Sequence, residues 1–379
     1  MVTDLWSRDV KFCRVEQKPI HVSWQALNRS IAFGIACLVL LLAGTGIAQQ
    51  NPGLTLRELV PANDTLAAQD LRFDASAAQL ALQYLRSNDA TVLEQLEQSP
   101  AVTHLLNHAR NFDYDVPKDS PHALVPALLA SPSKSPDPVG VCQRSLAFFN
   151  GPMLENPHWV NDTLRYLPDG FRFRGALFLT YGYDIGVAFS PSASLNCTHP
   201  HFDGHLRELL YYAIHELHHV GFMSIKPPRK FSDARTCRDL LWMAQYHTQL
   251  EGMAVLAAWQ RRREEHALND DSDYVALQDE AEMKREEALY FDKLKYLRER
   301  GDQPADNEAW AVLESLSAQR LWYRVGARMA QRIEQVSGRS ALVALIAENP
   351  EQFIATYQKT VASSQQPLLR DRPNRLVAR

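Results

Sequence analysis

The chain has 379 residues, of which 46% are apolar and 22% are charged. These proportions exclude a mainly disordered chain, a collagen-like repeat and a polytopic membrane protein. The 40 basic and 44 acidic residues give a net charge of −4. Because no basic excess is present to neutralise a phosphate backbone, we expect no nucleic-acid partner.

The first 48 residues have the pattern of a targeting segment. Residues 31–48 read IAFGIACLVLLLAGTGIA, carry no charge, follow Arg29 and end with the small residues Gly46 and Ala48 at the positions that signal peptidase requires. This predicts a secretory signal over residues 1–48, cleaved after Ala48, and an exported protein, periplasmic or extracellular. The alternative is an uncleaved membrane anchor, since about 18 apolar residues can just span a bilayer.

Three cysteines follow the predicted cleavage site: Cys142, Cys197 and Cys237. An oxidising compartment permits one disulfide among them and leaves one thiol over. The spacings do not tell which two cysteines pair, and they are not those of a zinc knuckle or a redox CxxC motif.

The region over residues 49–140 is predicted to be helical and to end in a linker. Apolar periodicity predicts one helix from Asp74 onward and a second over residues 90–111. Residues 117–140 then hold six prolines and four serines, which is typical of a linker or a long surface loop. This segment is the one candidate domain boundary.

After the linker the pattern is a short β element followed by helices. Glycines, aromatics and β-branched residues over 173–189 predict a hairpin, and helices are predicted over 204–223, 234–266, 274–297, 307–335 and 339–357. The expected fold is mainly α with a small β-hairpin or sheet (α+β). The charged runs at 261–265 (RRREE) and 284–287 (KREE) are predicted to be solvated helix faces, and residues 363–379 form a basic tail.

The segment ELLYYAIHELHHVGF, residues 208–222, contains the motif H-E-x-x-H. A helix turns about 100° per residue, so His215 and His219 share a face and can offer two ring nitrogens to one ion. Glu216 points about 80° away from their mean direction, where a general base for a metal-activated water must lie. The apolar surroundings predict a buried helix, in which unpartnered His and Glu are costly. We therefore expect a bound metal; the alternative is a helix with surface histidines.

A catalytic zinc ion takes three protein ligands and keeps one open position. The candidate third ligand is Glu251 in HTQLEGMAVLAAW, residues 247–259, thirty-two residues after His219. Small residues that share its helical face would let two helices approach closely: Ala244, Ala254 and Ala258. His247 is the rival ligand, and packing or support of a ligand are its other interpretations. For Glu251 the alternative is a solvated helix position.

HELHH followed by EGMA resembles the gluzincin type of zinc metallopeptidase, in which a downstream Glu is the third ligand. More narrowly it resembles uncharacterised bacterial families of zinc-dependent peptidases with HExxH followed by EGxA. Three further segments are similar to those families: RFDASAAQLAL from Arg72, YGYDIGVAF before the metal helix, and YRVGARMAQRIEQVSGR over residues 323–339. The resemblance implies a zincin-like region over residues 141–362, in which the active-site helix packs on a second helix that bears a ligand.

By resemblance, His215, His219 and Glu251 are the zinc ligands and Glu216 is the base for hydrolysis of a peptide or protein substrate. Tyr323, which opens the YRVG segment, is the candidate that stabilises the oxyanion, because such enzymes often use a late Tyr for this step.

The alternatives for the oxyanion residue are Tyr183 and Tyr212. Without a catalytic role, Tyr323 would be an aromatic side chain that only packs in the core. Val255 departs from the thermolysin-like pattern, which has Asp four residues after the ligand Glu.

Three other functions stay open: a zinc hydrolase of a non-peptide substrate, a catalytically silent zinc-stabilised binding protein, and a helical scaffold without a metal. A membrane partner is expected only if the N-terminal segment is uncleaved, and no signal predicts the oligomeric state.

Overall fold

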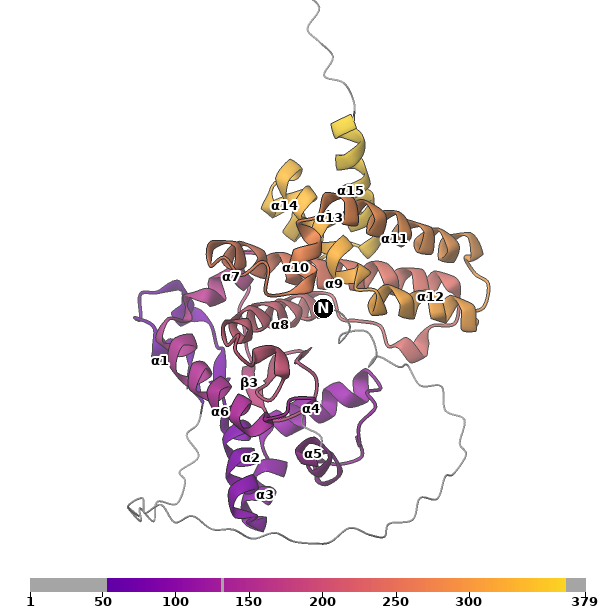
Figure 1. Cartoon of the computed structure of the whole chain (residues 1–379). Helices are drawn as coiled ribbons and strands as arrows, with labels where there is room; N and C mark the ends of the chain where they lie inside the picture. Colours follow the sequence, from indigo (N-terminus) through magenta and orange to yellow (C-terminus); the bar gives the residue numbers. More distant parts are fainter. Residues whose placement is uncertain (1–52, 131–132, 366–379) are drawn as a thin grey trace, which may run out of the picture.

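The computed structural model describes residues 53–130 and 133–365 (Figure 1). The predicted signal or anchor over residues 1–48 lies outside the described residues, as does the predicted basic tail apart from its first three positions. Across the described ranges, no helix combines the length and the apolar character needed to cross a membrane.

The fold is mainly helical with one small sheet, which confirms the α+β prediction. The helices in chain order are α1 (Leu56–Leu59), α2 (Ser76–Ser87), α3 (Ala90–Glu97), α4 (Pro100–Asn111), α5 (Pro121–Ala130), α6 (Pro138–Phe148), α7 (Val160–Leu164), α8 (Arg207–Ile225), α9 (Cys237–Glu264), α10 (Ser272–Leu277), α11 (Glu280–Arg300), α12 (Asn307–Ala318), α13 (Leu321–Ser337), α14 (Arg339–Ala344) and α15 (Pro350–Gln365).

The sheet has the order β1-β2-β3-β5-β4, with strands β1 (Leu54–Thr55), β2 (Arg72–Asp74), β3 (Ala176–Thr180), β4 (Gly186–Phe189) and β5 (Ser192–Asn196). The predicted hairpin over residues 173–189 is wrong, because β5 lies between β3 and β4, parallel to the first and antiparallel to the second. The sequence of β5, SASLN, lacks the β-branched and aromatic residues that signal a strand. The true hairpin is therefore β4–β5, and β4 is the edge strand.

Four predicted helices are each broken in two. Residues 274–297 divide between α10 and α11, and residues 339–357 divide between α14 and α15. Residues 90–111 divide at Pro100, where Ser99 caps α4 by accepting a hydrogen bond from the backbone N–H of Val102 at 3.3 Å. Residues 307–335 divide at Arg320, which has a φ of 59°. Local periodicity alone did not reveal these breaks.

The proline-rich segment 117–140 is not an open linker. It contains α5, which begins at Pro121 and buries Leu124, Val125 and Leu128. Proline is well tolerated in the first turn of a helix, where its missing N–H has no intrahelical partner. Strand β2, which precedes this segment, pairs in parallel with β3, which follows it. The domain boundary at residue 140 stays a prediction.

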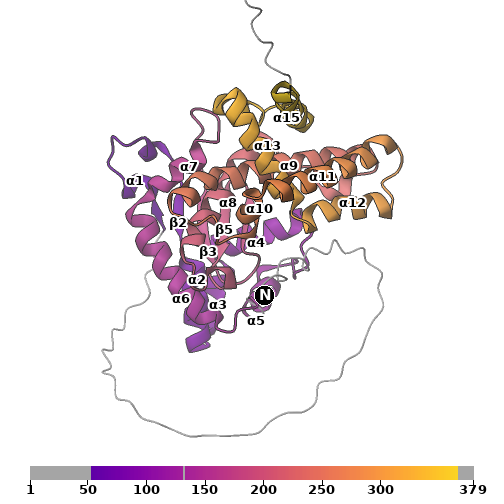
Figure 2. The same ribbon diagram turned by 45° about the horizontal axis from the view of Figure 1, so that its top comes forward.

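Helix α8 lies between the sheet and the C-terminal helices. It contacts β4 and β5 on one side and α9 on the other, while α2–α5 gather beyond the sheet and α11–α13 beyond α9 (Figures 1 and 2). A disulfide between Cys142 and Cys197 joins α6 to the end of β5, and Cys237 is a buried free thiol. One disulfide with one thiol left over is what the cysteine count predicts.

Candidate metal centre

The H-E-x-x-H motif lies in the middle of α8, a helix of 19 residues that is buried on most sides. His215 and His219 are one turn apart on its face toward α9, and their ring centroids are separated by 4.5 Å. Apolar residues surround the motif because the helix is packed between two layers. Both imidazoles are therefore held in a largely water-excluded place.

Helix α9 brings Glu251 to the two histidines. Its Oε2 lies 3.2 Å from Nε2 of His215 and 3.1 Å from Nε2 of His219. Donor atoms at the usual distances from a tetrahedral zinc lie about 3.3 Å from one another. The spacing between carboxylate and imidazoles therefore suits one such ion, and the three predicted ligands are brought together at one point.

The charges at this point favour a cation. Burial lowers the pKa of His215 to about 4. Burial acts in the same direction on His219, but the Glu251 carboxylate outweighs it and raises the pKa of that imidazole. Burial favours the neutral form of Glu251, yet the two histidines hold its pKa well below its usual range. Without a metal, the Glu251 carboxylate is thus ionised and favours the protonated form of His219, while His215 stays neutral.

Glu216 lies beside this point, as the helical geometry predicts. It is 5% exposed, and burial raises its pKa to about 8. A Cβ atom on Gly186 would lie only 2.9 Å from Cγ and from Oε1 of Glu216, so the edge strand β4 can pass this close only with glycine there. Among the residues that the structure describes, no donor is hydrogen-bonded to the side chain of Glu216, so it has no competing partner in the site.

Helix α13 presents Tyr323 to the same place. Its ring is nearly parallel to that of His215, with centroids 6.2 Å apart and an interplanar angle of 14°. Burial raises the pKa of the Tyr323 hydroxyl above its usual range. No hydrogen bond of this hydroxyl occurs within the described part of the chain, so it can donate to a ligand in the site.

The alternative tyrosines have other partners. The hydroxyl of Tyr183 lies 3.0 Å from Nδ1 of His108, and that of Tyr212 donates to Asp271 at 3.4 Å. These contacts leave Tyr323 as the tyrosine whose hydroxyl is available beside His215.

The other two histidines near the motif are packed among side chains. His247 is stacked between Trp322 and Phe231, with ring centroids at 4.8 and 5.3 Å. His218 is fully buried beside Phe222. Neither histidine joins the group of three donors, so the rival assignment of His247 as a ligand is not needed.

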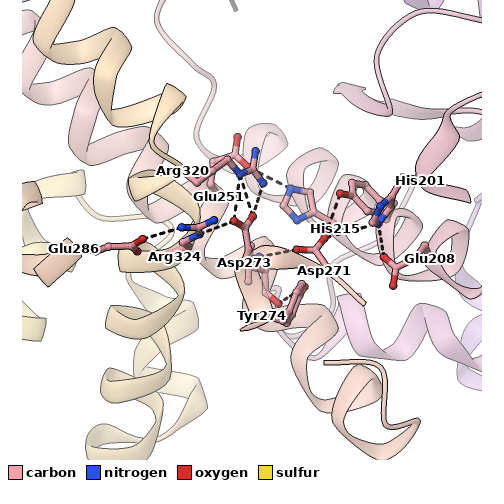
Figure 3. A network of polar contacts seen from close by, with 12 residues as sticks. His201, Glu208, His215, Glu251, Asp271, Asp273, Tyr274, Glu286, Arg320 and Arg324 are labelled. Atoms are coloured by element: carbon pink, nitrogen blue, oxygen red, sulfur yellow. Dashed lines mark hydrogen bonds and ion pairs between the residues drawn. The ribbon is translucent and has the colours of Figure 1, made fainter. Parts of the chain in front are cut away.

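A buried charge cluster next to the site was missed by the sequence analysis (Figure 3). The prediction that residues 261–265 form a solvated face is wrong at Arg262, which is 1% exposed. Its guanidinium pairs with Glu208 through two hydrogen bonds of 2.5 and 2.6 Å and lies between the rings of Tyr211 and Tyr274. This pair joins α9 to α8 two turns before His215 on α8 and three turns after Glu251 on α9.

His201, Glu208 and Asp271 form a second group of donors close enough to hold an ion. The positive charge that such a group needs is already supplied, because Arg262 contacts both Glu208 and Asp271. We therefore interpret this group as the acidic side of a buried ion-pair cluster.

A third set of contacts links α10 to α13. Asp273 accepts hydrogen bonds from Arg320 and Arg324, and Arg324 also donates to Glu286 (Figure 3). The guanidinium carbon of Arg320 lies 3.4 Å from the ring centroid of Tyr323. A short i, i+3 spacing between Arg320 and Tyr323 is the only sequence signal that could have suggested this contact.

The family model described as "Putative zinc dependent peptidase (DUF5700)" matches residues 158–366, which are more than half of the chain. The chain belongs to this family. The matched segment includes all five predicted site residues, and membership confirms a zinc peptidase family as the sequence resemblance suggested. No curated protein and no solved structure matches the chain.

Proposed function

We propose that the protein is an exported zinc metallopeptidase of the gluzincin type. His215, His219 and Glu251 hold the zinc ion, and Glu216 is the general base. The observation that carries this proposal is the convergence of one carboxylate and two imidazoles at a spacing of 3.1–3.2 Å, with the free carboxylate of Glu216 beside them. Membership of a zinc-dependent peptidase family supports the peptide bond as the target.

The side chains around this point have distinct tasks. When bound, zinc would supply a Lewis acid that activates water and polarises a carbonyl. Its positive charge would lower the pKa of Glu216, so that the carboxylate form prevails. Glu216 then takes a proton from the attacking water and gives it to the leaving amine. The hydroxyl of Tyr323 donates a hydrogen bond to the oxyanion that develops on the substrate.

Export is supported by the cysteines. The Cys142–Cys197 disulfide is of a kind that persists in oxidising compartments and is rare in the cytosol. It agrees with the secretory signal that the sequence predicts over residues 1–48.

The test is Glu216→Gln, which keeps the shape of the side chain and removes the base. We expect one zinc per chain in both proteins, by elemental analysis, and a loss of peptide hydrolysis of about 10²–10⁴-fold in the variant. Glu299→Gln, on the exposed end of α11, is the matched control and should keep full activity. The proposal is overturned if purified protein holds no stoichiometric zinc, or if it hydrolyses only non-peptide substrates.

A further inference from the structure

Arg320 has a backbone conformation that is unfavourable for an arginine. It lies between α12 and α13 with a φ of 59° and a ψ of 20°, in the left-handed region. In this conformation the Cβ atom of an L-residue lies too close to the following carbonyl oxygen, whereas glycine adopts it readily. Strained residues of this kind concentrate at functional sites. The strained backbone therefore suggests that the side chain of Arg320 has a functional role.

The guanidinium of Arg320 is fixed along one of its two hydrogen-bonding edges. Nε lies 3.1 Å and Nη2 lies 2.5 Å from Oδ2 of Asp273, which is itself only 4% exposed. Arg324, one turn further along α13, holds the same aspartate through its Nε at 2.8 Å. Arg320 therefore has a set orientation and a permanent positive charge.

The second edge of this guanidinium has no partner among residues 53–130 and 133–365. An arginine offers five N–H donors on a planar fork, and Asp273 uses the Nε and Nη2 side. Within the described residues no acceptor is bound to Nη1 of Arg320, and the side chain keeps 28% of its surface exposed. The pair Nη1 and Nη2 can thus still receive two oxygen atoms, which is the geometry of a bidentate carboxylate.

This open edge lies next to the candidate metal centre. The guanidinium carbon is 3.4 Å from the ring centroid of Tyr323, and that ring is stacked with His215. Figure 3 shows Arg320 next to Glu251 and His215. A peptide held at the metal by its scissile bond would therefore have its flanking groups within reach of Arg320.

We propose that Arg320 binds a carboxylate of the peptide substrate and makes the enzyme selective for substrates that carry one near the scissile bond. This inference rests on the proposed peptidase function. Two sources share the chemistry: the C-terminal carboxylate of a short peptide and the side chain of an Asp or Glu residue. Arg324 cannot replace Arg320, because its Nη1 is engaged by Glu286 at 2.8 Å.

The test measures binding without turnover. Zinc-loaded Glu216→Gln protein is titrated by calorimetry with four peptides that differ in a free or amidated C-terminus and in Glu or Gln beside the scissile bond. We expect one carboxylate to improve the affinity by roughly 10-fold or more, the value of a charge-assisted hydrogen bond. A difference between the free and amidated peptides would identify the C-terminal carboxylate as the group that is bound. A difference between the Glu and Gln peptides would identify the side chain.

Adding Arg320→Gln to this protein should remove the preference while zinc content and helical circular dichroism stay unchanged. Arg320→Lys, which keeps the charge but not the fork, should retain a smaller preference. Arg324→Gln is the matched control, since it loses a bond to the same Asp273 yet should keep the full preference. The inference is overturned if all four peptides bind alike, or if Arg320→Gln keeps the preference. Absence of zinc or of hydrolysis by the wild type would instead overturn the proposed function.

Discussion

Gly252 and Gly326 are in direct backbone contact where α9 crosses α13. A Cβ atom on Gly252 would lie 2.1 Å from the carbonyl carbon of Gly326, and one on Gly326 would lie 2.9 Å from the Cα of Gly252. Gly252 directly follows the predicted ligand Glu251, and Gly326 is one turn after Tyr323. The contact therefore sets how closely Tyr323 approaches His215, and it explains the glycines of the EGMA and YRVG segments.

Replacing Gly326 by alanine should separate the two helices. We expect a loss of about 1–3 kcal/mol in the free energy of unfolding, which is typical of overpacking, together with a fall in kcat because Tyr323 moves away from the site. Urea denaturation and steady-state kinetics measure the two effects. Gln335→Ala, at an exposed position of the same helix, should change neither. Wild-type stability in Gly326→Ala would contradict this account of the crossing.

Two histidines of HELHH, His215 and His218, should behave oppositely. His215→Ala removes a predicted ligand and should lower zinc affinity by several orders of magnitude, measured by competition with a chromogenic chelator. His218 is fully buried and lies outside the group of three donors, so His218→Leu should keep one zinc per chain. Loss of zinc from both variants alike would argue against the ligand assignment.

Arg262 should be among the most sensitive positions outside the site. Arg262→Met leaves Glu208 as a buried, uncompensated charge, and breaking such a pair costs about 3–5 kcal/mol. Urea denaturation of metal-free protein measures the loss. Arg263→Met changes the exposed neighbour of Arg262 and should stay within about 0.5 kcal/mol of wild type. Equal effects of the two substitutions would show that the buried pair does not tie α8 to α9.

His104 should make the fold sensitive to acid. Burial lowers its pKa to about 4, so the folded state excludes a proton that the unfolded chain takes up below about pH 6.5. The contribution of His104 to the free energy of unfolding is therefore fully present above that pH. It declines by about 1.4 kcal/mol per pH unit as the pH falls toward 4.

Unfolding of metal-free protein in urea at pH 7 and pH 5 measures this decline without interference from zinc loss. In His104→Leu the difference between the two pH values should be smaller than in wild type. An unchanged difference would mean that other groups carry the acid sensitivity.

The site was more predictable from the sequence than the sheet. His215, Glu216 and His219 are arranged by the turn of one helix, and Glu251 by the turn of another, so a local period is enough to find them. The order β3-β5-β4 depends instead on pairing between strands, and the weak pattern of SASLN gives no warning of it.

The charged residues were mispredicted for a related reason. Arg262 stands within a run that has every local property of a solvated face, and its burial follows from a partner 54 positions earlier in the chain. The same holds for Glu286 in the KREE run, which is also buried and whose partner Arg324 is 38 positions away. A periodicity argument cannot detect partners at such distances.

Hydrogen bonds join helices α8 and α9 on both sides of the predicted metal ligands. Near one end Arg262 holds Glu208 and Arg207 holds Glu265, and near the other the hydroxyl of Tyr246 donates to the carbonyl oxygen of Lys226 at 2.8 Å. The shape of the site thus exists before an ion arrives. We therefore expect metal binding to proceed without coupled refolding, so that no affinity is lost to ordering the chain around the ion.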